Sequence, residues 1–391
     1  MSDHTDLPDP TTLAREFRLD PDVAYLNHAA VAPWPARTAE AVARFAAENL
    51  QRGAQYYPRW LALERRLRER LARLLGAASA DDIALLKSTS EGLSLVAHGL
   101  GWAGGENVVG VHADFPSNRV VWQSLTRYGV SFRGVDVVAA TDPEQALIDA
   151  CDRDTRLLAV SSVHFVTGLR LDLARLGAFC RRRGILFCVD AIQSLGAVPL
   201  DVDACEVDFL AADGHKWLTS PEGLAVFYCR PELRERLTLY QYGWHMLEHP
   251  GDYDRLDWQP AATAARFECG SPNMLGIHGM EASLSLIEEV GSARIATRLA
   301  ERLAWLDERL RGRIDWRVAT PSEPERRAGI FTLVPASPAI AEAAYQHLVA
   351  RSVVCANRGG GIRFSPHWHT PTAVLERAAL ELAAFCASGS S

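Results

Sequence analysis

Two residues of opposite charge, Asp190 and Lys216, follow short apolar runs and could take part in covalent chemistry. Of the 41 lysines and arginines only Lys87 and Lys216 are lysine, so the chain uses arginine almost wherever it needs a positive charge. Arginine stays protonated, whereas a deprotonated lysine amine can attack a carbonyl carbon and form a Schiff base. The scarcity of lysine favours a nucleophilic amine at Lys216 over the alternative, an ordinary surface lysine.

The residues before Asp190 and Lys216 predict that both side chains lie at one edge of a β-sheet. Residues 185–189 read ILFCV and residues 208–212 read DFLAA. Such short apolar runs are typical of strands that are buried on both faces of a parallel sheet. Ligands bind beyond the carboxyl ends of strands in sheets of this kind. We therefore expect the acid and the amine to face the same crevice.

A further strand leads into hydroxyl side chains that could bind an anion. The apolar run at residues 83–86 is followed by Ser88, Thr89 and Ser90 and then by an apolar helical segment. Free N–H groups at the start of a helix, together with its dipole, attract phosphate, and hydroxyl groups add donors. An ordinary helix cap by Thr89 or Ser90 is an equal alternative. Lys87 is the rival Schiff-base candidate, or a charge beside the anion.

Strand-like runs and helical periodicity alternate from residue 83 to residue 229, which predicts an α/β domain with a mostly parallel sheet. Helical periodicity at residues 36–76 precedes it. Residues 240–265 are rich in aromatic, proline and acidic residues, which predicts a long loop over a site or an interface. We divide the chain into an N-terminal segment (1–22), a large α/β domain (23–265) and a smaller C-terminal α+β domain (266–391).

The composition is that of a soluble globular protein, with 48% hydrophobic and 23% charged residues and a net charge of -7. This mildly acidic balance does not favour nucleic acid as a partner. No apolar run is long enough to span a membrane, and the polar start of the sequence lacks the apolar core of a signal peptide. The eight cysteines contain no CxxC pair, which fits a reducing compartment. We therefore expect a cytoplasmic protein without a membrane partner.

An acid, an amine and a phosphate cradle on one parallel sheet match the needs of pyridoxal 5′-phosphate. An amine holds its aldehyde, a carboxylate keeps its pyridine nitrogen protonated, and N–H and hydroxyl donors hold its phosphate. A nucleotide is less favoured, because neither G-x-G-x-x-G after a strand nor G-x-x-x-x-G-K-[ST] occurs. His367 and His369 have a spacing that can ligate zinc, but no acid or thiol lies near them in sequence. We therefore predict no metal.

Eight motifs together resemble the class V aminotransferase family, in the group that includes cysteine desulfurases, selenocysteine lyases, kynureninase and isopenicillin N epimerase. In chain order they are YLNHAA, STSEG, ADFPSN, VTG, VDAIQS, DGHKW, RFECGSPN and IRFSPHWHT, from about residue 25 to about residue 370. The resemblance implies the type I fold of pyridoxal-phosphate-dependent transferases, with a mostly parallel sheet of the seven-stranded type. It also implies an enzyme that labilises a bond at the α-carbon of an amino acid.

The resemblance implies a role for each matching residue. Lys216 holds the aldehyde, Asp190 pairs with the pyridine nitrogen, and Arg363 grips the substrate carboxylate by a bidentate contact. Ser271 resembles the family residue that reaches the phosphate of the neighbouring subunit, which implies a homodimer with shared active sites. The implied cofactor-binding residues are Thr89, Ser90, Phe115, Thr167, Asp190, Gln193, His215, Lys216 and Ser271, and the implied substrate-binding residues are Asn27, Ala29 and Arg363.

Three positions depart from the pattern of many relatives. Asp213 stands where they have a serine, and an acid is a poor phosphate ligand. Phe115 is expected to stack on the cofactor ring, where the desulfurases have a histidine. Cys355 ends an apolar run, which favours a packed thiol over a sulfur-accepting cysteine. We favour an elimination of the desulfurase or carbon–sulfur lyase kind. The alternatives are an aminotransferase, an amino-acid epimerase and a non-enzymatic binding or regulatory module.

Overall fold

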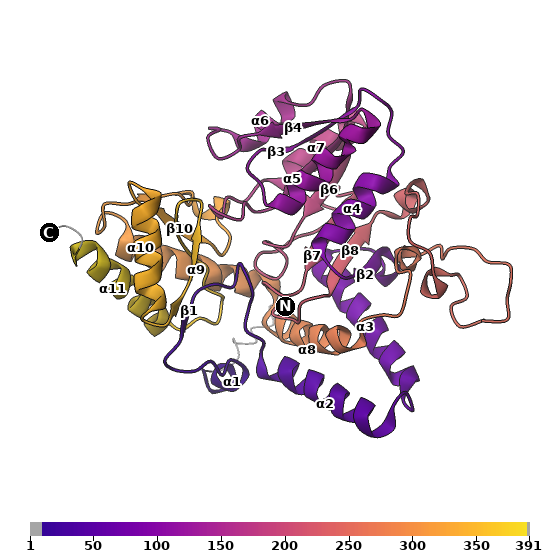
Figure 1. The fold of residues 1–391 in the computed structure, drawn as a ribbon, viewed down its shortest axis with the longest axis horizontal. Coiled ribbons are helices and arrows are strands. Elements are labelled where there is room, and N and C mark those ends of the chain that lie inside the picture. The colour runs from indigo at the N-terminus through magenta and orange to yellow at the C-terminus, as the bar shows by residue number, and fades with distance from the viewer. Residues whose placement is uncertain (1–9, 389–391) are drawn as a thin grey trace, which may run out of the picture.

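Seven strands form the central sheet of the protein (Figure 1). We describe residues 10–388 in a computed structural model. Strand β8 runs antiparallel to both of its neighbours, whereas the other neighbouring pairs are parallel, as the sequence predicted. The order of the strands across the sheet is β2 (Ile83–Leu86), β8 (Ala225–Cys229), β7 (Phe209–Asp213), β6 (Leu186–Asp190), β5 (Thr155–Ser161), β3 (Asn107–Val111) and β4 (Ser131–Val135).

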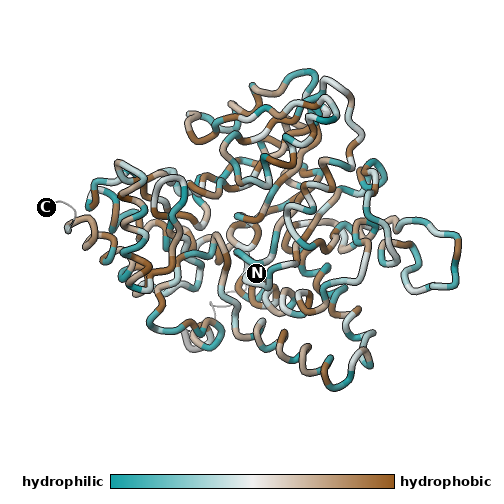
Figure 2. The backbone as a smooth tube through the Cα atoms, in the orientation of Figure 1, coloured by the Kyte–Doolittle hydropathy of each residue, from teal (hydrophilic) through white to brown (hydrophobic). Residues whose placement is uncertain are grey.

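Alternate side chains of the strands pack against helices on the two faces of this sheet. Val109 and Leu158 join one apolar core with α3, α7 and α8, and their chain neighbours Val108 and Leu157 join the other core with α4 and α5. Figure 2 shows hydrophobic stretches within this layered interior. These helices are α3 (Tyr57–Leu75), α4 (Thr89–Gly99), α5 (Pro116–Gln123), α7 (Leu173–Arg183) and α8 (Met274–Val290).

The C-terminal part of the chain builds a second, four-stranded sheet with its own apolar core. Its strands, in spatial order, are β12 (Ala356–Arg358), β13 (Gly361–Phe364), β10 (Phe331–Val334) and β9 (Arg317–Val318). The helices of this part are α9 (Ser292–Leu310), α10 (Pro338–Val349) and α11 (Thr372–Ser388). In Figure 1 it lies to one side of the large sheet.

Two segments pack against a different part of the protein from the one to which the predicted domain boundaries assign them. The early strand β1 (Ala24–Tyr25) pairs in parallel with β11 (Val353–Val354), and Ala24 joins the C-terminal core. Helix α8 packs on α2 (Ala36–Arg52) and α3 of the large part, although it follows residue 266. The domain boundary at residues 265 and 266 stays a prediction.

The remaining elements are short. In Figure 1, helix α1 (Pro10–Glu16) lies below the second sheet. Helix α6 (Pro143–Asp149) lies next to β4 of the large sheet. Short 3₁₀ helices occupy Ala80–Asp82, Ser124–Tyr128, Pro231–Arg236, Trp244–Met246, Ala264–Phe267 and Pro324–Arg326. No helix within residues 10–388 is long and apolar enough to cross a bilayer.

The parallel strands bring several polar chain segments to one edge. In the ladder that joins β5 and β6, Ser161 pairs with Asp190, and Asp190 in turn pairs with Ala211 of β7. The loops after β2 and β3 emerge at the same edge, because these strands run in the same direction. The sheet therefore positions the residues that the sequence singled out.

Candidate active site

Lys216 is a buried amine at this edge of the sheet. It follows β7, and 8% of its surface is exposed. Burial disfavours the charged form and lowers the pKa of the amine to about 8, although the carboxylate of Asp190 opposes this shift. Its Nζ lies 5.5 Å from the centroid of the Phe115 ring. The side chain of the rival Lys87 is 71% exposed and pairs with Glu91 at 3.8 Å, so we favour Lys216 as the reactive amine.

Asp190 is a buried acid that ends β6, and it is 2% exposed. Burial raises the pKa of its carboxyl group to about 7. One carboxylate oxygen, Oδ1, accepts a hydrogen bond from the N–H of Ile192 at 2.9 Å, and Oδ2 accepts one from Nδ2 of Asn118 at 2.6 Å. It forms no ion pair with any of residues 10–388. A buried carboxylate without a cation suits a ligand that brings a protonated nitrogen.

Arg363 is the complementary case, a buried cation without an acid. It lies on β13 and is 2% exposed. Its Nη1 donates to the carbonyl oxygen of Phe165 at 2.7 Å, its Nη2 lies 3.5 Å from Oδ1 of Asn27, and its Nε has no partner among the described residues. Burial lowers the pKa of the guanidinium to about 10. Because a buried charge is costly unless it is paired, this arginine fits a ligand carboxylate.

The first turn of α4 supplies hydroxyl groups at the same edge. Ser88 caps the helix, since its side chain accepts a hydrogen bond from the N–H of Glu91 at 3.2 Å. The capping residue is therefore Ser88, and not Thr89 or Ser90 as the sequence analysis considered, because these two residues already belong to the first turn of the helix. The hydroxyl groups of Ser90 and Ser117 share a hydrogen bond of 2.8 Å. These groups form a polar rim that fits a phosphate group.

Asp213 ties the end of β7 to the start of α4. Its Oδ2 accepts a hydrogen bond from the N–H of Thr89 at 2.9 Å, and its own N–H donates to Oγ1 of Thr89 at 2.9 Å. Its Oδ1 lies 3.8 Å from Nδ1 of His215. Burial lowers the pKa of His215, and the Asp213 carboxylate opposes that shift. Asp213 thus occupies one N–H of the helix start and partly offsets the effect of burial on the pKa of His215.

Gln193 and Thr167 already have protein partners. The amide of Gln193 donates to the carbonyl oxygen of Ala29 at 3.0 Å and accepts from Nε1 of Trp217 at 2.9 Å. The hydroxyl group of Thr167 lies 3.1 Å from Nδ1 of His164 within its own turn. Gln193 therefore fixes the position of Ala29, which the resemblance puts in the substrate pocket. Direct contacts of Gln193 and Thr167 with a cofactor stay predictions.

Ser271 lies apart from the other predicted residues. It is exposed on the segment before α8, where it lines a cavity of about 210 Å³ together with Lys87. No hydrogen bond of the described residues joins it to Lys216 or Asp190. This position fits a residue that acts on a neighbouring subunit, and that role stays a prediction.

The sequence did not predict a role for three polar residues in the hydrogen-bond network of Asp190. Asn118 and Asp114 belong to the motif ADFPSN, and Ser161 ends β5. All three are buried at the carboxyl edge, where Asn118 contacts Asp190 directly. Asp114 lies in the loop after β3 and Ser161 ends β5, so the carboxyl ends of parallel strands were a signal for these two, whereas Asn118 lies within α5.

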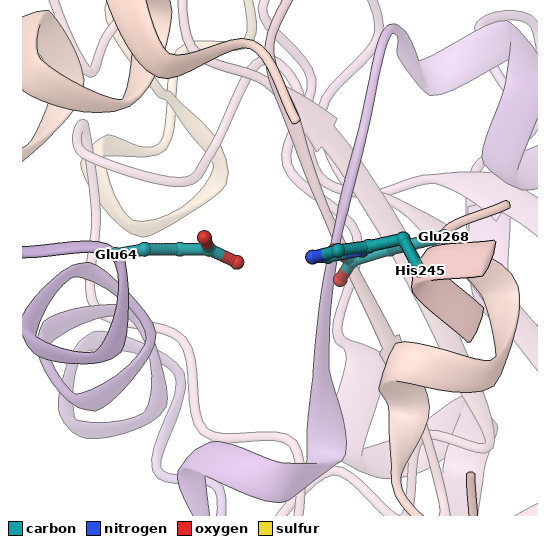
Figure 3. A group of neighbouring side chains, drawn as sticks. All are labelled: Glu64, His245 and Glu268. Atoms are coloured by element: carbon teal, nitrogen blue, oxygen red, sulfur yellow. The ribbon is translucent and has the colours of Figure 1, made fainter. Parts of the chain in front are cut away.

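One cluster of possible metal ligands lies away from this edge. Glu64 points towards His245 and Glu268 across a short gap (Figure 3). Nη2 of Arg68 donates to Glu64 at 2.5 Å and to Glu268 at 2.8 Å, so a guanidinium already neutralises the two carboxylates. A second cation beside Arg68 would be repelled. We therefore assign an ion-pair cluster here and no metal.

His367 and His369 belong to a group of packed aromatic side chains. Their ring centroids lie 4.8 Å apart, and the ring of His28 lies 5.1 Å from that of His367. His369 stacks on Phe17 with 3.4 Å between ring centroids, and His367 stacks on Trp217. Burial lowers the pKa of all three histidines, so they stay neutral. Their alternation in sequence serves this packing.

The charges at the sheet edge fit the ends of pyridoxal 5′-phosphate. Asp190 is an acid without a cation for the pyridine nitrogen, and Lys216 is an amine with a lowered pKa for the aldehyde. The hydroxyl-rich start of α4 offers donors for the phosphate. Arg363 remains for the carboxylate of a substrate. The residues present therefore fit both the cofactor and an amino acid.

Comparisons with known proteins agree with this geometry. Residues 24–362 match the family described as aminotransferase class-V. The chain is 33% identical to a probable cysteine desulfurase of Methanothermobacter thermautotrophicus, over 72% of this chain and 70% of that protein. It is also 33% identical to a cysteine desulfurase of Klebsiella pneumoniae, over 73% of this chain and 71% of that protein.

Solved structures show the same fold. The apo cysteine desulfurase of Thermococcus onnurineus NA1 superposes with a TM-score of 0.85 at 24% identity, covering 98% of this chain and 99% of that one. The cystine C-S lyase C-DES, solved with its product cysteine persulfide, gives a TM-score of 0.85 at 24% identity over 93% of this chain and 98% of that one. The fold class predicted from the sequence is therefore confirmed. The chain belongs to the class-V aminotransferase family and is an enzyme that uses pyridoxal 5′-phosphate.

Proposed function

We propose that this enzyme is a carbon–sulfur lyase that acts on a cysteine-like amino acid. The observation that supports the proposal most is that one site contains two buried basic groups: Arg363, which has no acidic partner, and Lys216, whose amine has a lowered pKa. The relatives named cysteine desulfurase and the structural likeness to a cystine C-S lyase support a sulfur-containing substrate.

Each residue of the site has a definite task in such a reaction. Arg363 binds the substrate carboxylate through its guanidinium group, and the exposed ring of Phe115 lies beside the amine at the entrance. The bound cofactor withdraws electrons from the α-carbon. Lys216 Nζ, with a pKa of about 8, can take up the α-proton and later return it near neutral pH. The carbon–sulfur bond then breaks, and the sulfur leaves with the bonding electron pair.

Cys355 distinguishes a lyase from a desulfurase, because a desulfurase passes sulfur to a thiolate. Cys355 is buried between β11 and β12, and burial raises the pKa of its thiol to about 12, although Arg363 opposes this shift. A thiol that stays protonated is a poor sulfur acceptor. We therefore infer that the sulfur leaves with its own substituent and that hydrolysis by one water molecule converts the rest of the substrate to pyruvate and ammonia.

The lyase proposal is tested by measuring the products from L-cysteine and L-cystine. We expect pyruvate and ammonia in equal amounts together with a free thiol, persulfide or sulfide, and no pyruvate from Lys216→Ala. Alanine as the main product would indicate a desulfurase, and a different keto acid that depends on an amino acceptor would indicate an aminotransferase. A D-amino acid would indicate an epimerase, and no turnover of any amino acid would leave a binding module. Each of these results overturns the lyase.

We also infer a cytoplasmic homodimer. The eight cysteines form no disulfide within residues 10–388, which suits a reducing compartment. Large apolar side chains on the segment between β8 and α8 are exposed, among them Tyr240, Tyr242 and Trp258. Tyr240 also lines a groove of about 500 Å³ with Ser88 and Ser90, next to the start of α4. A second copy would cover this apolar surface and bring its Ser271 to the phosphate end. Light scattering that gives the mass of one chain, 42.9 kDa, at micromolar concentration would contradict the dimer.

A further inference from the structure

A chain of short hydrogen bonds runs from Asp190 into the interior. Nδ2 of Asn118 donates to Oδ2 of Asp190 at 2.6 Å and lies 3.0 Å from the hydroxyl oxygen of Ser161. The hydroxyl group of Ser161 donates in turn to Oδ1 of Asp114 at 2.8 Å. All four side chains are buried. The acid of the cofactor site is thus linked through two neutral groups to a second buried carboxylate.

The far end of this chain leads back to the cofactor site. Oδ1 of Asp114 accepts a hydrogen bond from the backbone N–H of Phe115 at 2.7 Å, and Oδ2 accepts one from the N–H of Ser161 at 3.3 Å. Phe115 is the residue whose ring lies 5.5 Å from Nζ of Lys216. One buried network therefore connects the acid, Asp190, to the backbone that carries the aromatic ring.

Asn118 is suited to hold this carboxylate in one orientation. Oδ1 of Asp190 is fixed by the N–H of Ile192, so rotation of the carboxylate is prevented only if Oδ2 is fixed as well. An amide nitrogen provides two donors, one for Asp190 and one for Ser161. The opposite orientation of the amide would set an oxygen against the carboxylate and is disfavoured. An aspartate at this position would add a like charge instead of a donor.

We propose that Asn118 and Asp114 are positioning residues of the cofactor site: Asn118 fixes the carboxylate of Asp190, and Asp114 fixes the backbone of Phe115. This inference rests on the proposed contact of Asp190 with the pyridine nitrogen. Neither residue touches the reacting atoms. Their contribution is a fixed distance and angle between the acid and the aromatic ring.

A double-mutant cycle on the full-length protein tests the proposal. The dissociation constant of pyridoxal 5′-phosphate is measured by tryptophan fluorescence for the wild type, Asn118→Ala, Asp190→Ala and the double variant. Loss of a hydrogen bond to a charged group should weaken cofactor binding about 10-fold in Asn118→Ala. The same substitution should have an effect below about 2-fold in the Asp190→Ala background, because the bond that it removes is already absent. Asp114→Asn should change the circular dichroism of the bound cofactor.

The control is Asn357→Ala, because Asn357 also donates to a carboxylate, Glu342, at 2.8 Å but lies at the surface. Unchanged cofactor affinity in Asn118→Ala overturns the proposal. An equal loss in both backgrounds also overturns it, since Asn118 would then act through general stability and not through Asp190. If Asp190→Ala binds the cofactor as tightly as the wild type, the contact on which the inference rests is wrong, whatever products the enzyme forms.

Discussion

Reactivity at the residue scale comes from burial without a matching partner. The basic side chains of Lys216 and Arg363 are buried, and so is the acidic side chain of Asp190. Pairing them directly with one another would satisfy each charge but would close the site. The fold keeps them apart, so each charge remains available for one end of a ligand.

The lowered pKa of Lys216 can be measured without turnover. In cofactor-free protein, the rate of modification of Lys216 by a small amine-reactive reagent should rise with pH and reach half of its maximum near pH 8, because only the neutral amine reacts. Mass spectrometry of the Lys216 peptide gives the rate at each pH. The peptide that contains Lys87 is the internal comparison. A midpoint near the ordinary value of 10.5 would show that burial does not control this amine.

Replacement of Arg363 should weaken substrate binding more than the chemical step. In Arg363→Lys the charge stays but the two-pronged contact is lost, and we expect KM for the amino acid to rise about 10-fold or more. The cofactor spectrum should stay unchanged, since lysine retains the positive charge that acts on Lys216. Arg309→Lys on the exposed surface of α9 is the control. An unaltered KM would remove Arg363 from the carboxylate role.

At the scale of elements, the position of α4 over the sheet decides where its hydroxyl groups lie. Gly92 of α4 faces Ala211 of β7, and a Cβ atom added at Gly92 would lie 2.8 Å from the Cβ of Ala211. Thr89, one turn earlier, is hydrogen-bonded to Asp213 at the end of the same strand. The close approach of helix and strand therefore sets the hydroxyl groups at the start of α4 beside the end of β7, which Lys216 follows.

Gly92→Ala should push α4 away from β7. We expect a loss of about 1–3 kcal/mol in the free energy of unfolding, as for other overpacked sites, and weaker cofactor binding. Gly104→Ala is the matched control, because a Cβ at Gly104 meets no atom within 4 Å. Urea denaturation gives the stability, and equilibrium dialysis gives the cofactor affinity. A stable Gly92→Ala protein with full affinity would show that the helix can shift at no cost.

The sequence predicted those parts of the site that depend on a single strand and the turn after it. Asp190 and Lys216 follow apolar runs, and parallel strands must end at one edge, so their proximity could be inferred. The bond between Asn118 and Asp190 could not, because it depends on how α5 docks on β5 and β6. The pairing of β1 with β11 joins residues far apart in the chain, and no local pattern records it.

At the scale of the whole molecule, the chain segment before α2 is held against the C-terminal part by buried histidines. Nδ1–H of His28 donates to the carbonyl oxygen of Ser365 at 2.9 Å, and the centroid of its ring lies 5.1 Å from that of His367 and 5.4 Å from that of His369. Its chain neighbours are held nearby: Oδ1 of Asn27 lies 3.5 Å from Nη2 of Arg363, and the N–H of Ala29 donates to Oγ of Ser365 at 3.0 Å. Protonation of these rings would therefore loosen the substrate side of the site as well as the fold.

Stability should fall in acid because of this cluster. Burial lowers the pKa of His28 to about 4 from an ordinary 6.5, so the unfolded chain binds more protons than the native protein below pH 6.5. The contribution of neutral His28 to the free energy of unfolding is fully present above pH 6.5 and decreases as pH falls, and the loss is on the order of 3 kcal/mol at pH 4.

Asp190, whose pKa is raised to about 7, has the opposite effect on stability, so the pH dependence of the wild type alone does not isolate the effect of His28. The difference in unfolding free energy between wild type and His28→Gln removes the Asp190 contribution. This difference should shift in favour of the variant as pH falls from 7 to 5, and the exposed His112→Gln should show no such shift. A difference that is independent of pH would show that folding leaves the pKa of His28 unchanged, and would contradict an effect of its burial on stability.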